Sequence, residues 1–252
     1  MKEIVRDCQI LLILSAILFS SISYSQSNVR LIFPTATEET DYIWRTIIDT
    51  RFFKENNYQV SLPEGKLIKT LQEKALKNQL SDKDYKKLKQ FVTAKVFNKK
   101  DYLKGYEKTK KDIKLIETLL KQIDEDELNW DFKKFKTYEV ILTLYGPGGS
   151  FDPETGRIIL YITKEGNYKQ YKKAAHTIIH EITHIGIQES IVNEFNVAHT
   201  LKERIVDLFV KLYFGKQLPN YKIQDMGDYR IDPYLKSKND IKKLNKYVRL
   251  IE

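Results

Sequence analysis

The chain has 252 residues, of which 42% are hydrophobic, so it can build one or two compact domains with a substantial core. This composition excludes a wholly disordered protein. The net charge is +9, and most of the excess lies in residues 64–138, where lysines and acidic residues alternate at helical spacing. We interpret that region as solvated helix faces and expect no nucleic-acid partner.

Residues 1–25 have the features of a secretory signal peptide. Basic residues precede an apolar run of 13 residues at 10–22, and small residues flank the expected cleavage site. The run is shorter than the roughly 20 residues that span a bilayer. We expect export to the periplasm or the extracellular space, with no stable membrane span after cleavage; an uncleaved anchor is the alternative. The only cysteine, Cys8, lies in this segment, so the mature chain would form no disulfide.

Residues 26–137 are predicted to form a mostly helical region. Apolar residues recur there at helical spacing, and Gly and Pro are rare after residue 65. An acidic run at 124–127 is interpreted as a solvated helix end, because it lacks the spaced ligands of a calcium loop. The expected elements are a strand at 29–33, a helix at 40–53 capped by Thr37 or Thr40, a strand at 58–62, and three amphipathic helices within 66–126 with breaks near Ser81 and Asn98.

The second predicted region, residues 138–252, begins with the two strongest strand signals, at 138–145 and 157–163. The intervening loop is rich in Gly and Pro, so we predict a hairpin directly before the helix that follows. Gly148 and Gly149 in this loop have two open interpretations, a close approach of a substrate backbone or an ordinary turn. An irregular stretch at 215–232 and a basic helix at 235–249 are expected to close the chain.

All four histidines of the chain lie between residues 176 and 199. His180 and His184 are four residues apart, so a helix would present both imidazoles to one metal ion. Glu181 completes an H-E-x-x-H pattern, in which two histidines bind zinc and the glutamate acts as general base on the attacking water. His176 and His180 have the same spacing, but Thr177 would then stand at the position of the base.

A catalytic zinc site needs a third protein ligand. The sequence resembles the gluzincin metallopeptidases, whose third ligand is a glutamate on a second helix. Eighteen residues separate His184 from Glu203, as in the aminopeptidase N branch, and Asp207 follows Glu203 in the Glu-x-x-x-Asp pattern. The resemblance implies that Asp207 hydrogen-bonds a ligating imidazole. Glu189 and His199 remain alternative third ligands.

The resemblance also implies a zincin-like α+β fold, with a small mixed sheet and an edge hairpin packed on the active-site helix. It implies one Zn²⁺ ion held by His180, His184 and Glu203, with Glu181 as the catalytic base. Gluzincins place a Tyr or His opposite the zinc to stabilise the oxyanion, and Tyr229 is our candidate for that catalytic role, with His199 as the alternative. The loop at 146–150 does not match the amine-binding segment of the aminopeptidases.

We therefore predict an exported zinc metallopeptidase that hydrolyses peptide or protein substrates. The alternative, from another functional class, is a non-catalytic binding module of the cell envelope, either stabilised by zinc or free of metal. Such a module would use the lysine-rich helices to bind anionic polymers.

Overall fold

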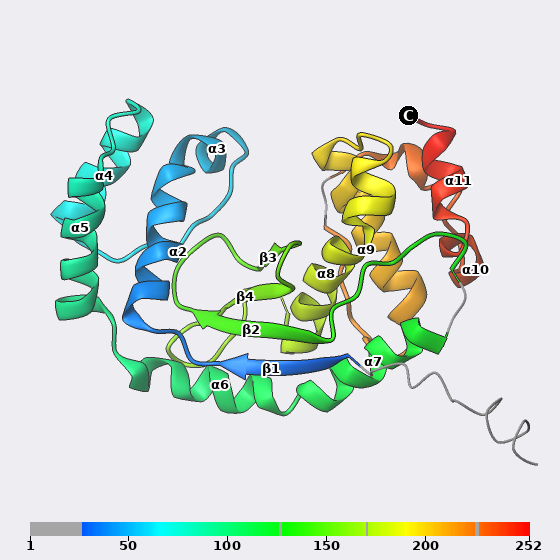
Figure 1. Cartoon of the computed structure of the whole chain (residues 1–252), viewed down its shortest axis with the longest axis horizontal. Coiled ribbons are helices and arrows are strands. Elements are labelled where there is room, and N and C mark those ends of the chain that lie inside the picture. Colours follow the sequence, from blue (N-terminus) through cyan, green and yellow to red (C-terminus); the bar gives the residue numbers. More distant parts are fainter. Residues whose placement is uncertain (1–26, 126–127, 170, 225–226) are drawn as a thin grey trace, which may run out of the picture.

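The computed structural model describes residues 27–125, 128–169, 171–224 and 227–252, which form an α+β structure (Figure 1). The predicted signal peptide lies outside the described residues. Within the described part of the chain, no helix is both long and apolar enough to cross a membrane.

A four-stranded mixed sheet with the order β1-β2-β4-β3 forms the centre of the molecule (Figure 1). The strands β1 (Asn28–Ile32), β2 (Thr137–Thr143) and β4 (Arg157–Tyr161) are parallel, and β3 (Ser150–Asp152) runs antiparallel to β4 at one edge. The predicted α+β class with a small mixed sheet and an edge hairpin is confirmed. Because β1 pairs with β2, the sheet crosses the boundary that was predicted between residues 137 and 138.

The hairpin does not join the strands that the sequence suggested. The prediction that 138–145 pairs antiparallel with 157–163 is wrong, because β2 and β4 run in parallel. The chain reverses twice between them. Gly146 and Gly148, with φ of 116° and 156°, lie in the first reversal, and Gly156, with φ of 72°, closes the second. The short strand β3 between the reversals therefore becomes the antiparallel partner of β4.

A helical group with its own small core lies to one side of the sheet (Figure 1). Its helix α2 starts one residue after Thr35, whose hydroxyl accepts a hydrogen bond from the backbone N–H of Glu38, so the predicted caps Thr37 and Thr40 are wrong. The expected strand at 58–62 is reduced to one bridge between Ser61 and Gly146. The elements of this group are α2 (Ala36–Ile48), α3 (Thr50–Glu55), α4 (Lys66–Leu76), α5 (Asp82–Phe91) and the π-helical turn η1 (Val92–Val96).

The expected break at Ser81 is present, with a capping box to Asp84. The last of the three helices predicted within 66–126 is divided into two near Lys111. The elements after η1 are η2 (Lys99–Tyr102), α6 (Leu103–Lys110) and α7 (Ile113–Glu125), which are followed later in the chain by α8 (Ala174–Ile187), η3 (Gln188–Asn193), α9 (His199–Phe214), η4 (Tyr229–Ile231), α10 (Lys238–Ile241) and α11 (Leu244–Arg249).

The helix α8 is the central element of the larger core. It packs against β3, β4, α6, α7 and α9, and every residue of it except Thr177 is buried. A helix that is buried on all sides must satisfy each of its polar side chains inside the protein. The histidines and the glutamate of α8 therefore need internal partners.

Glu39 anchors α2 to the end of β2, although its side chain is completely buried. Its carboxyl group lies 2.6 Å from the hydroxyl of Tyr102, 3.0 Å from the backbone N of Leu144 and 2.8 Å from the hydroxyl of Thr143. The Thr143 hydroxyl is also 3.0 Å from the carbonyl of Tyr145, and one proton cannot serve both acceptors. Burial raises the pKa of Glu39, so a protonated Glu39 donating to Thr143 satisfies the whole network.

We expect Glu39→Gln to fold with nearly wild-type stability and Glu39→Ala to lose roughly 3 kcal/mol, because alanine leaves buried donors unpaired. At pH values between the unfolded and the folded pKa of Glu39, the folded protein holds a proton that the unfolded chain has lost. The contribution of this proton to the free energy of unfolding is full below the unfolded pKa and is lost as the pH rises through the folded pKa. Urea unfolding from about pH 4 to pH 8 should show this decline in the wild type and not in Glu39→Gln. If the free energies of unfolding of the two proteins changed in parallel with pH, Glu39 would not be protonated in the folded protein.

Candidate metal centre

Two helices bring three potential metal ligands together. His180 and His184 lie one turn apart on α8, and Glu203 lies on the neighbouring α9. The Nε2 atoms of the two histidines are 3.1 Å apart, and Oε2 of Glu203 lies 3.7 Å from Nε2 of His180 and 3.4 Å from Nε2 of His184. All three side chains are buried.

These separations of 3.1, 3.4 and 3.7 Å are close to the edges of a tetrahedron. Ligands bound to zinc at about 2.0–2.2 Å lie roughly 3.3–3.6 Å from one another. Two imidazole nitrogens and one carboxylate oxygen are also the donor types of a catalytic zinc site. The group formed by His180, His184 and Glu203 could therefore hold a metal ion.

Burial and close contacts shift the pKa values of all three side chains. Burial raises the pKa of Glu203, but hydrogen bonds from His180 and His184 outweigh it and hold that pKa well below its usual range. Burial lowers the pKa of His180, but Asp207 and Glu203 outweigh it and raise that pKa to about 10, whereas burial lowers the pKa of His184 to about 4. Near pH 7 and without a metal ion, the centre therefore contains an ionised Glu203, a protonated His180 and a neutral His184, so a metal ion would displace one proton from His180.

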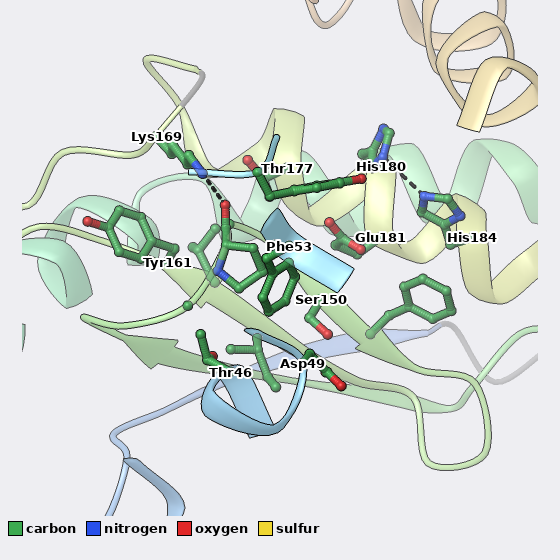
Figure 2. Close-up of a pocket in the computed structure, with 18 of the residues that line it drawn as sticks. Thr46, Asp49, Phe53, Ser150, Tyr161, Lys169, Thr177, His180, Glu181 and His184 are labelled. Atoms are coloured by element: carbon green, nitrogen blue, oxygen red, sulfur yellow. Dashed lines mark hydrogen bonds between the residues drawn. The ribbon is translucent and has the colours of Figure 1, made fainter. Parts of the chain in front are cut away.

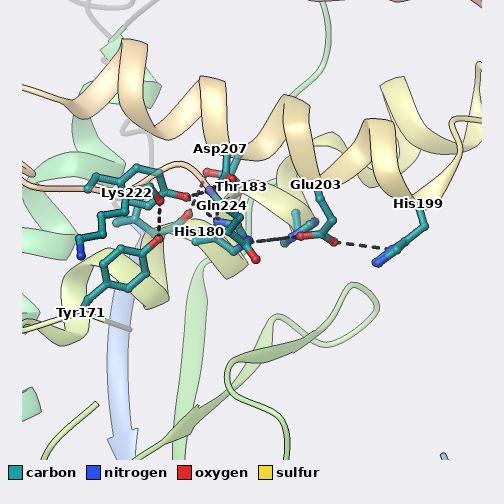
Figure 3. A network of polar contacts seen from close by, with 11 residues as sticks. Tyr171, His180, Thr183, His199, Glu203, Asp207, Lys222 and Gln224 are labelled. Carbon is teal, nitrogen blue, oxygen red and sulfur yellow. Dashed lines mark hydrogen bonds and ion pairs between the residues drawn. The ribbon is translucent and has the colours of Figure 1, made fainter. Parts of the chain in front are cut away.

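Asp207 lies one turn beyond Glu203 on α9 and is completely buried (Figure 3). Its Oδ1 is 3.4 Å from Nδ1 of His180, and its Oδ2 accepts a hydrogen bond of 2.7 Å from the backbone N–H of Gln224. The hydroxyl of Tyr221 lies 2.6 Å from both Nδ1 of His180 and Oδ1 of Asp207. Sequence reasoning missed Tyr221, because nothing in its local spacing separates it from the other tyrosines of the chain, 16 in all.

A cavity of about 400 Å³ opens beside the cluster (Figure 2). The view shows His180, Glu181 and His184 on one wall, and on the other Thr46 of α2 and Asp49, the residue between α2 and α3. The loop before β3, the strand β3 itself and the start of α9 also contribute to the lining. The helix α2, from the small helical group, thus forms a wall of the site.

Searches of protein-family models, curated proteins and solved structures found no match to this chain.

Glu181 faces the cavity from α8 beside the candidate metal ligands, and burial raises its pKa to about 7. Its carboxylate packs against the loop before β3. A Cβ atom added to Gly149 would come within 2.1 Å of Oε1 of Glu181 and 2.8 Å of Cγ2 of Thr177. The absent side chain of Gly149 thus leaves room for Glu181.

The segment that contains Tyr58 is tied to the same loop. The backbones of Ser61 and Gly146 exchange two hydrogen bonds, and Nζ of Lys169 donates to the carbonyls of both Gln59 and Pro147. Tyr58 lines the cavity, and burial and the nearby charge of Glu203 raise its pKa. A phenol hydroxyl from the N-terminal region is therefore present near the cluster.

The structure does not bring Tyr229 to the cluster. Its ring is 53% exposed, lies over the guanidinium of Arg204 and is absent from the cavity lining. Of the alternative third ligands, Glu189 lies on η3 and accepts a hydrogen bond from Asn193. His199 lines the cavity, and its Nδ1 is 3.7 Å from Oε1 of Glu203, on the side away from the two imidazoles (Figure 3).

Proposed function

We propose that this chain is an exported zinc-dependent metallopeptidase of the gluzincin type. The observation that carries the proposal is the convergence of His180, His184 and Glu203 at tetrahedral spacing, with Glu181 in the same cavity. This donor set is the one that zinc uses in peptidases that activate water. The H-E-x-x-H motif and Asp207 support the same assignment.

A zinc ion held by the three side chains would supply a water of lowered pKa and a Lewis acid for the scissile carbonyl. Glu181 takes the proton of the attacking water and passes it to the leaving amine. The buried Asp207 holds His180 in the orientation of a ligand. Tyr58 and His199 are our candidates among the cavity side chains for donation to the developing oxyanion, in place of Tyr229.

The strand β3 offers a binding edge for an extended substrate. It is the last strand of the sheet on the side of the cavity, and its residues Ser150 and Phe151 line that cavity. The Phe151 ring stacks on the His184 imidazole with centroids 4.8 Å apart, so the edge lies next to the metal ligands. A peptide that added a strand to this edge would pass directly over the cluster.

The proposal is tested by metal analysis of protein purified without added zinc, followed by cleavage of a peptide library with and without a chelator. We expect about one zinc per chain, and cleavage that the chelator stops and added zinc restores. Stoichiometric, strongly salt-dependent binding to an anionic polymer with no cleavage would instead support the binding-module alternative. Protein without bound metal and without cleavage would overturn the proposal.

Replacing Gly149 with Ala is expected to lower hydrolysis by up to about 100-fold and to leave metal content unchanged. The new methyl group would displace the Glu181 carboxylate, which lies 2.1 Å from the position of the added Cβ. Steady-state kinetics and metal analysis measure the two effects separately. Glu154→Ala, in the exposed turn between β3 and β4 and outside the cavity lining, is the control and should stay close to the wild type. A Gly149→Ala enzyme with the wild-type rate would show that Glu181 need not occupy this position.

A further inference from the structure

Tyr221 stands between a buried carboxylate and a proposed metal ligand. Its hydroxyl is 2.6 Å from Asp207 Oδ1 and 2.6 Å from His180 Nδ1, whereas those two atoms are 3.4 Å from each other. The shorter path from Asp207 to His180 thus runs through the Tyr221 hydroxyl. In the Glu-x-x-x-Asp pattern, the aspartate was expected to bond an imidazole directly.

The direction of these hydrogen bonds follows from counting protons. An ionised Asp207 can only accept, and its other oxygen already accepts from the backbone N–H of Gln224. Tyr221 has one hydroxyl proton, which it donates to Asp207. Its oxygen then has only lone pairs for His180, so Nδ1 of His180 must carry the proton. The nitrogen of His180 that can offer a lone pair to a metal ion is therefore Nε2, the atom that faces His184 and Glu203.

The tyrosine is held in place by its neighbours. Its side chain is buried, and its ring stacks on Tyr171 with centroids 5.3 Å apart and an interplanar angle of 14°. His176 lies parallel to the same ring, and its Nε2 is 3.2 Å from the carbonyl of Pro219. His176, the first histidine on α8, thus fixes the segment that carries Tyr221 and is not part of the metal cluster.

We propose that Tyr221 is a positioning residue that selects Nε2 of His180 as the metal-binding nitrogen and transmits the charge of Asp207 to it. This inference rests on the metal site of the proposed function. Outer partners of this kind change metal affinity by roughly 10- to 100-fold.

The test compares Co²⁺ binding by the wild type, Tyr221→Phe and Tyr168→Phe. The first variant removes only the hydroxyl between Asp207 and His180. The second is a matched control, because the buried Tyr168 hydroxyl lies 3.0 Å from the Thr109 hydroxyl and Tyr168 is outside the cavity lining. Affinity is measured by competition with a chromophoric chelator, and the visible absorption of bound Co²⁺ reports the ligand field.

We expect Tyr221→Phe to bind Co²⁺ about 10- to 100-fold more weakly with a shifted spectrum, and Tyr168→Phe to match the wild type. Wild-type affinity and an unchanged spectrum in Tyr221→Phe would overturn this inference alone. A wild-type protein that binds no Co²⁺ would overturn the metal site as well. If Tyr221→Phe does not fold, 3-fluorotyrosine at position 221 keeps the ring and hydroxyl but weakens the acceptor. An unchanged spectrum and affinity there would also overturn the inference.

Discussion

Replacing Glu181 with Gln is expected to lower peptide hydrolysis by roughly 100- to 10,000-fold while zinc remains bound. Gln has nearly the same shape as Glu, so it can keep the position against Gly149, but it cannot take a proton from water. The metal ligands His180, His184 and Glu203 are untouched. The steady-state rate and the zinc content of the same preparation give both results.

The matched control is Glu189→Gln. Glu189 is an exposed carboxylate on η3, beyond the end of α8, and its partner is Asn193 rather than a residue of the cavity. This variant should hydrolyse peptides at the wild-type rate. A Glu181→Gln protein that cleaves at the wild-type rate would remove the proposed mechanism, whereas one that loses zinc would show that Glu181 supports the metal site itself.

Replacing Glu203 with Ala is expected to weaken zinc binding by more than the roughly 100-fold that follows loss of an outer partner, because a direct ligand is removed. The two imidazoles alone leave the ion with too few protein ligands for a stable tetrahedral site. Zinc should therefore raise the melting temperature of the wild type and have little effect on that of the variant. Chelator competition and thermal unfolding with and without zinc measure these effects.

His199→Ala is the control that separates the two possible third ligands on α9. His199 lies one turn before Glu203, and its side chain is 46% exposed. We expect this variant to bind zinc as tightly as the wild type. If Glu203→Ala kept its affinity for zinc and His199→Ala lost it, the third ligand would be His199.

The local part of the site was predictable from the sequence. His180, Glu181 and His184 lie within one and a half helical turns, so the pitch of an α-helix alone places both imidazoles on one face. The position of Glu203 was inferred from a family resemblance, since eighteen intervening residues do not determine where a second helix packs. In the structure, the turn through η3 returns the chain so that α9 lies beside α8.

The tertiary contacts that the sequence did not reveal are long-range. Tyr221 reaches His180 across 41 residues, and Glu39 reaches Leu144 across 105. Such contacts depend on how loops cross the core, and loop residues carry no periodic signal. The candidate Tyr229 illustrates the same difficulty, because its η4 turn places the ring on the surface while Tyr58, from the opposite end of the chain, lines the cavity.

The sequence by itself determined the helical and strand segments of the larger core and the pair of imidazoles on α8, because these depend on periodicity within a few turns. Only the tertiary structure decided that β2 and β4 run in parallel, that α2 walls the cavity, and that Glu203 and Asp207 face His180. Chain reversals and helix packing set those relations. They are determined by the burial of all apolar faces at once, and no single segment encodes that outcome.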